Sequence, residues 1–136
     1  MQEEIVFSTS KREELVDINS KVEEIVAKAK IKEGFCNVFC LHATGAIIIN
    51  ENYDHKVQED IVDAMKKLIP AGVWKHDQVD GNGDSHVKAA IVGPSETVPI
   101  KDGKMQMGTW QSLGFCEFDG PRGVRKVIVT VMEGGR

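Results

Sequence analysis

The chain has 136 residues, of which 41% are hydrophobic and 28% are charged, and its formal net charge is −4. This length fits one compact domain, and the balanced composition excludes disordered and fibrous proteins. The acidic balance argues against nucleic acid as a partner, and no apolar run approaches the ~20 residues of a membrane span. Since the chain starts with acidic residues where a signal peptide would be basic, we expect a cytoplasmic protein with one domain over residues 1–136.

The first half of the chain predicts four strands and two helices. Apolar residues at spacings of three and four predict a helix that starts at Asn19-Ser20, with Ser20 and Glu23 as a capping box, and ends at Gly34. Strands are expected at about residues 5–9, 14–18, 35–41 and 46–50. A second helix should run from about Lys56 to Leu68 and stop before Pro70 and Gly72, with its inner face made by Val57, Ile61, Met65 and Leu68.

The second half begins with a polar, glycine-broken loop and continues as strands. Residues 87–92 fit either a short strand or one or two turns of helix capped by Ser85. Asp102-Gly103 predicts a hairpin between residues 96–100 and 105–107. A second hairpin is expected between residues 109–118 and 124–132, so that the C-terminal half would form an antiparallel meander.

The three cysteines favour a structural role. Cys36 and Cys40 lie on one face of an apolar strand, where they resemble small buried hydrophobic residues rather than zinc ligands or nucleophiles. Trp110, which lies in a strand beside Gln111, fits a buried core position better than a pocket or an oligomer contact.

Three histidines are the main candidates for chemistry. His76 and His86 lie in the polar loop, and His42 follows an apolar strand. If they converge, three imidazoles can hold a divalent metal, Zn²⁺ in the first place and Mg²⁺ as the alternative, with a water or a substrate oxygen in the fourth position. The competing interpretation is a surface loop with incidental histidines, and spacing alone does not decide between them.

Other polar residues complete the hypothesis. Glu51 and Asp77 are candidates to orient a histidine or to move a proton. Lys88, Ser95 and Arg125 are candidates to bind a phosphate, and each could instead be a solvated side chain. Asp60 and Asp84 are expected to be solvated loop charges.

Several motifs in this order resemble the YjbQ-type family over essentially the whole chain. They are His42-Ala43-Thr44, Ile49-Asn50-Glu51-Asn52, Asp54, His76-Asp77, Asn82, His86-Val87-Lys88, Gly93-Pro94-Ser95, Val98-Pro99, Gly103, Gly108-Thr109-Trp110-Gln111 and Glu117. Ala43 departs from this pattern, because the family has a threonine at that position.

The resemblance implies an α+β fold, an antiparallel β-sandwich with two main flanking helices, and assembly as a homotrimer. The family is labelled a secondary thiamine-phosphate synthase, which joins a pyrimidine diphosphate to a thiazole phosphate. The family's histidines fall on His42, His76 and His86, and its acidic positions on Glu51, Asp54, Asp77 and Glu117. We therefore expect a metal-binding enzyme that acts on a small phosphorylated molecule. The alternatives are a non-catalytic trimeric binding protein and a metal-assisted hydrolase.

Overall fold

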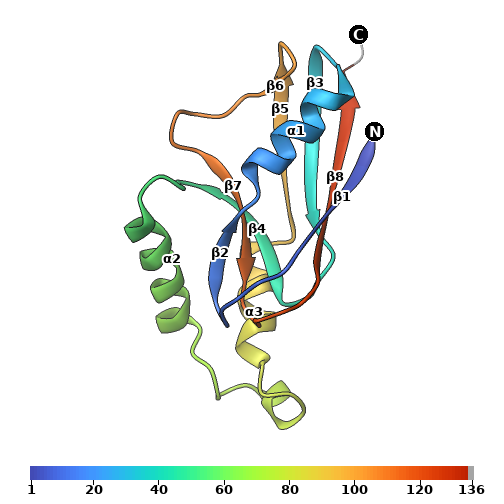
Figure 1. Ribbon diagram of the computed structural model, residues 1–136. Helices are drawn as coiled ribbons and strands as arrows, with labels where there is room; N and C mark the ends of the chain where they lie inside the picture. The colour runs from blue at the N-terminus through green and yellow to red at the C-terminus, as the bar shows by residue number, and fades with distance from the viewer. Residues whose placement is uncertain (135–136) are drawn as a thin grey trace.

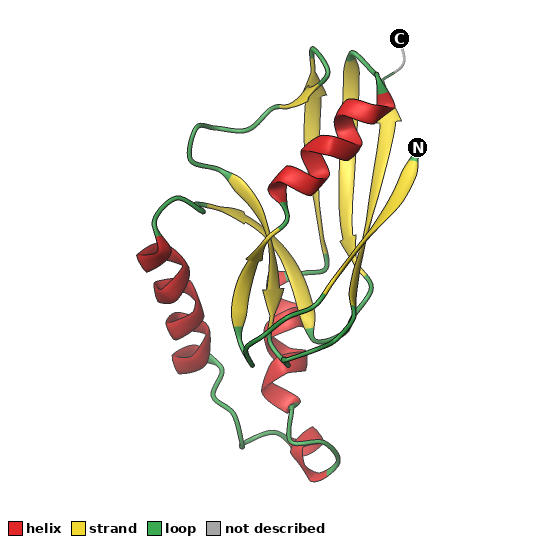
Figure 2. Ribbon diagram, viewed as in Figure 1, coloured by secondary structure: helices red, strands yellow, loops and turns green. Residues whose placement is uncertain are grey.

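Two antiparallel sheets form the body of the protein, as the computed structural model of residues 1–134 shows (Figures 1 and 2). Sheet A has the strand order β1 (Gln2–Phe7), β8 (Arg125–Glu133), β3 (Glu33–Cys40), β5 (Ser95–Lys101) and β6 (Lys104–Met105). Sheet B has the order β2 (Glu14–Asp17), β7 (Ser112–Glu117) and β4 (Gly45–Asn50). The expected α+β class with antiparallel sheets is confirmed.

The core lies between the inner faces of the sheets and helix α1 (Asn19–Ala29). Period-two alternation turns Cys36, Val38 and Cys40 of β3 inward, where all three are buried. Cys116 is buried as well, and burial raises the pKa of all three thiols above the ordinary value. The cysteines are therefore inert core residues, as the sequence predicted.

The predicted ends of α1 differ from the observed ones. The cap position is Ile18, whose side chain cannot accept a hydrogen bond, and Asp17 Oδ1 instead accepts from the Asn19 N–H at 2.9 Å, so the predicted capping box of Ser20 and Glu23 is wrong. The helix ends at Lys30, whose left-handed backbone stops it four residues before the predicted end. Gly34 instead lies in β3, where a Cβ would come within 2.0 Å of the Met132 carbonyl oxygen. That glycine permits close strand packing rather than a helix stop.

The predicted C-terminal meander is wrong in one respect. The β5–β6 hairpin forms as expected, with Ile100 opposite Met105. In contrast, β7 pairs with β2 and β4 in sheet B, while β8 pairs with β1 and β3 in sheet A. Residues 118–124 therefore cross from one sheet to the other, because strand partners come from distant segments that local turn signals do not specify.

Two further helices lie on the sheet B side of the molecule. Helix α2 (His55–Leu68) is capped by Asp54 and has no buried residue; the prediction for Leu68 is wrong, since this residue is 77% exposed. Helix α3 (Gly83–Val92) decides between the two predictions for residues 87–92, and Ser85 lies inside it rather than at its cap. No helix of residues 1–134 has the length and apolar character that crossing a membrane requires.

Candidate functional site

Several loops and helix ends meet at the lower end of the molecule in Figure 1. They are the 3-10 helix η1 (Lys75–Gln78), the start of α3, and the connections β3–β4 and β7–β8. These segments carry the three predicted histidines. We refer to this region as the histidine end and define it by His42, His76, Asn82, His86, Asp119 and Arg122.

His76 of η1 and His86 of α3 face each other. Their ring centroids are 4.8 Å apart and the ring planes are inclined by 80°. The Nε2 atom of His76 is buried and has no hydrogen-bond partner; Asp80 Oδ2 lies 3.5 Å away but lacks hydrogen-bond geometry. The Oδ1 atom of Asn82 is buried without a partner as well. Because buried polar atoms are normally paired, these two atoms point to a ligand.

Asp77 holds η1 in place. Its Oδ2 accepts a hydrogen bond from the Trp74 backbone N–H at 3.0 Å, and its Oδ1 accepts one from the Gly83 N–H at 2.8 Å. Gly83 is required at this contact, since a Cβ there would lie 2.4 Å from the Trp74 Cβ. The carboxylate proposed for proton transfer therefore has both oxygens committed to the loop that carries His76.

His42 is engaged through its Nε2 atom. This nitrogen accepts a hydrogen bond from the Lys126 backbone N–H at 2.8 Å. Burial lowers the pKa of His42, and Arg125 lowers it further. The ring is therefore neutral at pH 7, and its Nδ1 carries the proton. In this orientation His42 offers a hydrogen-bond donor to a ligand, whereas a metal needs a free nitrogen lone pair.

Arg125 is buried in an ion pair with Glu117. Its Nε donates to Glu117 Oε1 at 2.8 Å and its Nη2 donates to Thr44 Oγ1 at 3.0 Å, while Thr9 Oγ1 donates to Glu117 Oε1 at 2.7 Å. Burial raises the pKa of Glu117, but the hydrogen bonds from Arg125 and Thr9 outweigh this effect and keep it below the ordinary value. The predicted phosphate ligand Arg125 thus supports the turn that follows His42.

Lys88 is also fully committed. Its ammonium is buried and contacts Glu13 and, at 2.8 Å, Asp84, which in turn pairs with Arg12. Asp84 is completely buried, so its expected solvated position is wrong. Both basic residues expected to bind phosphate are therefore neutralised inside one chain.

A link that the sequence did not suggest joins the start of α3 to the β7–β8 connection. Asp119 Oδ2 accepts hydrogen bonds from Asn82 Nδ2 at 2.8 Å and from Arg122 Nη2 at 2.7 Å. Arg122 remains exposed, so its guanidinium is accessible to an anion. The one sequence signal for this link is the Asp119-Gly-Pro-Arg122 turn, which the sequence predicts as a hairpin connection and in which Arg122 could be either an anion ligand or a turn charge.

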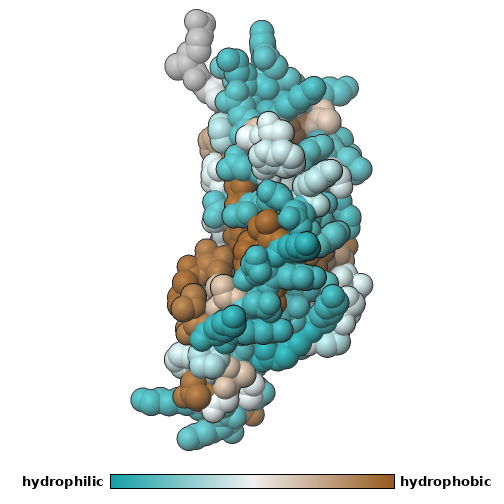
Figure 3. Space-filling model, turned by 90° about the vertical axis from the view of Figure 1, so that its left-hand side faces the viewer, coloured by the Kyte–Doolittle hydropathy of each residue, from teal (hydrophilic) through white to brown (hydrophobic). Residues whose placement is uncertain are grey.

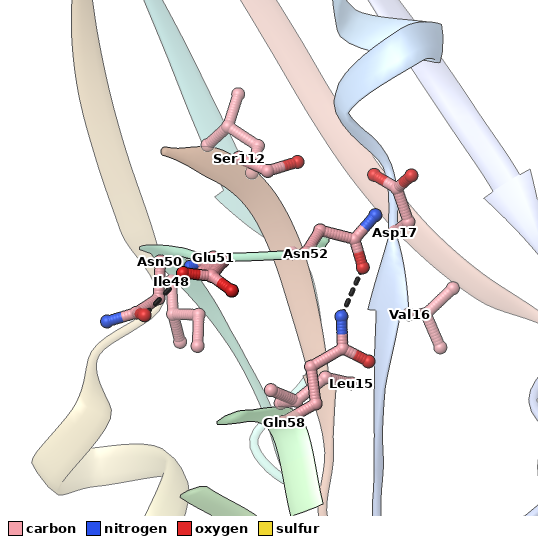
Figure 4. A pocket seen from close by; sticks show the side chains of 11 residues that line it. Leu15, Val16, Asp17, Ile48, Asn50, Glu51, Asn52, Gln58 and Ser112 are labelled. Carbon is pink, nitrogen blue, oxygen red and sulfur yellow. Dashed lines mark hydrogen bonds between the residues drawn. The ribbon is translucent and has the colours of Figure 1, made fainter. Parts of the chain in front are cut away.

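Glu51 lies at the opposite end of sheet B. It follows β4, which starts three residues after His42, and the five steps from Gly45 to Asn50 along β4 separate the two positions by about 17 Å at ~3.3 Å per residue. Glu51 Oε2 accepts from the Asp54 N–H at 3.2 Å and borders a hollow lined by Asp17, Asn52 and Gln58 (Figure 4). The hollow has a volume of about 20 Å³, which is room for roughly one water. Ser95 begins β5 and is half-buried.

Within residues 1–134, no three histidine, cysteine, aspartate or glutamate side chains are grouped closely enough to hold a metal ion. One chain thus brings together two of the three predicted metal ligands, His76 and His86, and places His42 at the same end in a different role.

The chain is similar to a group of small proteins from archaea and bacteria. Residues 3–134 match the family described as "UPF0047 protein YjbQ-like". A UPF0047 protein of Methanocaldococcus jannaschii is 46% identical over 116 residues, which cover 85% of this chain and 83% of that protein. The UPF0047 protein YugU of Bacillus subtilis is 37% identical over 90% of this chain and 92% of its own length.

The fold is also shared with solved structures. A "YbjQ-like protein" from Sulfolobus solfataricus superposes with a TM-score of 0.95 at 38% identity, covering 98% of this chain and 97% of the other. A yjbq/upf0047 family protein from Clostridium acetobutylicum superposes with a TM-score of 0.91 at 40% identity, covering 96% and 99%. None of these names carries the thiamine-phosphate synthase label or any other activity.

Proposed function

The chain belongs to the YjbQ-like UPF0047 family, and from the geometry of its histidine end we propose that it is a cytoplasmic enzyme that binds and transforms a small phosphorylated molecule there. The observation that carries this proposal is the His76–His86 pair with its unpartnered, buried Nε2 atom. Polar atoms left unpaired in a structural loop would be costly, and a bound ligand removes that cost.

The surroundings of the histidine pair suit an anion. Arg122 presents an exposed guanidinium, which is held in orientation by Asp119. Neutral His42 adds a donor N–H on its Nδ1 atom, and the exposed cation Lys126 is its neighbour in the fold, where the Lys126 backbone N–H donates to His42. Positioned cations and N–H donors are what bind a phosphate and stabilise the charge that develops on a leaving phosphate. We assign to Arg122 the direct role that the sequence had suggested for Lys88 and Arg125.

A divalent metal fits the site in part. His76 and His86 bring two imidazoles together, with 4.8 Å between ring centroids, and leave the Nε2 atom of His76 without a partner. Imidazole nitrogens are common zinc ligands. Nitrogen donors favour Zn²⁺ over Mg²⁺, which prefers oxygen. A bound ion would polarise a phosphoryl oxygen. His76 and His86 would hold it, whereas His42 would first have to give up its hydrogen bond to Lys126.

The specific reaction we propose to test is thiamine-phosphate synthesis. A bond forms between the thiazole nitrogen and the methylene carbon of the pyrimidine, while the bond from that carbon to the diphosphate oxygen breaks and the diphosphate leaves with the electron pair. Arg122 and the Nδ1–H of His42 would face the leaving group. A protein that binds a phosphorylated molecule without turnover and a metal-assisted hydrolase are the competing functions.

Metal analysis of untagged protein, together with assays, separates these possibilities. The proteins to compare are wild type and the His42→Ala, His76→Ala and His86→Ala variants, with circular dichroism as the folding control. We expect the amount of bound metal per chain to fall at least tenfold in His76→Ala and in His86→Ala. We expect His42→Ala to keep its metal but to bind diphosphate more weakly than wild type. Loss in all three folded variants would instead support the three-histidine site.

Wild type that takes up no metal would eliminate the metal and leave the histidines as proton-transfer or anion-binding groups. Product formed from the pyrimidine diphosphate and the thiazole phosphate, abolished by His86→Ala, would exclude the binding-only function. Release of phosphate from simple esters would favour the hydrolase.

A further inference from the structure

A second set of exposed groups lies at the other end of sheet B. Tyr53 is 81% exposed and Trp110 is 60% exposed, and their rings meet edge to face with centroids 5.6 Å apart. They line a surface hollow together with Glu51, Asp54, His55 and Lys56. We refer to these six residues as the aromatic corner. Trp110 was expected in the core, and that prediction is wrong.

Polar atoms near the aromatic corner lack partners inside the described part of the chain. No hydrogen bond within residues 1–134 involves Glu51 Oε1 or Asn52 Nδ2. The other oxygen of Glu51 accepts from the Asp54 N–H, and the oxygen of Asn52 accepts from the Gln58 side chain. Figure 4 shows these side chains around the small hollow that Glu51 borders. Such a surface combines large aromatic area with fixed polar groups, which is the composition of binding hot spots.

We infer that the aromatic corner of one copy of this chain lies against the histidine end of a second copy and supplies Glu51 and Trp110 to a shared site. The inference rests on the proposed function for the nature of the site, but the contact itself does not depend on it. Within one chain the two regions cannot meet, because about 17 Å of β4 separates them.

Apolar surface around the histidine end supports a protein neighbour. Val73 and Val79, which flank η1, are 68% and 74% exposed, and Ile91 of α3 is 67% exposed. Figure 3, which looks at the molecule from the α2 side, shows apolar surface in the lower half of this face next to a broad hydrophilic area. Leu68 at the end of α2 is exposed as well, and apolar surface area of this kind marks a contact surface.

Charge complementarity identifies the neighbour as a second copy. Around the histidine end the cations Lys75, Arg122 and Lys126 are all exposed, whereas among the carboxylates of Asp77, Asp80 and Asp119 only Asp80 is exposed. The aromatic corner carries the carboxylates of Glu51 and Asp54 against the single ammonium of Lys56, and exposed Asp17 lines the adjoining hollow. Opposite charges of this kind steer association and set its register.

The type of contact also limits the type of assembly. Because two different surfaces meet, the contact is heterologous, and repeated contacts of this type form a ring where the rotation between neighbours closes and an open filament where it does not. A ring of three copies would agree with the trimer that the family resemblance implies. In such a ring every site would contain the histidines of one copy and Glu51 of the next.

Cross-linking tests the contact without metal or substrate. Two variants, Tyr53→Cys and Lys75→Cys, are mixed, allowed to exchange subunits and treated with a short bismaleimide. The native cysteines do not interfere, since all three are buried. We expect a covalent dimer from the mixture and none from either variant alone or from Lys75→Cys mixed with Lys101→Cys, whose cysteine lies on the β5–β6 hairpin. A monomeric wild type, or no covalent dimer from variants that still assemble, would overturn the inference.

Complementation tests the shared site. Trp110→Ala and His86→Ala should each lower diphosphate affinity at least tenfold. Co-expressed, they should regain about one quarter of the wild-type sites, because random mixing in a heterologous ring joins two unmutated surfaces at that frequency. Cross-linking without recovery would show contact but no shared site. If wild type binds no diphosphate, the proposed function fails, while the cross-linking result still decides whether the contact exists.

Discussion

Arg125 and Glu117 form a buried ion pair next to the turn that carries His42. Glu117 has no exposed surface and receives hydrogen bonds from Arg125, Thr9 and the Asp119 backbone, while Arg125 also donates to Thr44. The pair thus connects the end of β7, the start of β8 and the loop before β4. Through these contacts, the buried carboxylate of Glu117 stabilises the turn before β4, which carries His42.

Replacement of Glu117 by glutamine should destabilise the protein by about 3–5 kcal/mol, because it leaves the Arg125 guanidinium buried without its counter-charge. Urea unfolding followed by circular dichroism measures the change. The double variant Glu117→Leu with Arg125→Met removes both charges and should cost much less. If Glu117→Gln and the double variant lose the same free energy of unfolding, the pair stabilises the protein through packing rather than through charge.

Acid should weaken the folded state through Glu117. Since its pKa is below the ordinary value in the folded protein, the unfolded chain binds the proton more readily. The stabilisation by this carboxylate is therefore complete above about pH 5 and is lost as pH falls through the folded pKa. Urea midpoints measured from pH 7 to pH 3 should fall more steeply in wild type than in Glu117→Gln. Parallel curves would contradict this assignment.

Gly83→Ala should disturb the histidine pair. The added Cβ would lie 2.4 Å from the Trp74 Cβ and 3.0 Å from Asp77 Oδ1, so that η1 must move away from α3. We expect a loss of about 1–3 kcal/mol and weaker diphosphate binding. Gly123→Ala is the matched control, because its Cβ would meet no atom within 4 Å. The prediction fails if the two variants have the same stability and affinity.

Asp77→Ala should release η1 while leaving both sheets folded. Without the carboxylate, the Trp74 and Gly83 N–H groups lose their acceptor, and the Trp74 ring should become more solvated. In a Trp110→Phe background, Trp74 is the remaining tryptophan, and its emission maximum should shift to longer wavelength. An unchanged spectrum combined with a complete loss of activity would instead support a direct catalytic role for Asp77.

The sequence alone determined the local elements of this protein. The periodicity of apolar residues specified α1 and α2, Asp102-Gly103 specified one hairpin, and alternation placed Cys36 and Cys40 in the core. These features depend on neighbours within a few residues, so they can be predicted from spacing. The same reasoning identified the polar loop that contains His76 and His86, two residues that the fold brings into contact.

Only the tertiary structure decided which strands pair and which charges are free. Residues 112–117 and 125–133 are close in sequence but belong to different sheets, because their partners come from distant segments. Lys88 and Arg125 look available in the sequence and are neutralised by Asp84 and Glu117 in the fold. Burying an unpaired charge is costly, so both residues are paired in the fold. Asp84 and Lys88 have the i, i+4 spacing of a helix, but the sequence left open whether these residues form one, and the Glu117–Arg125 pair joins strands of two different sheets.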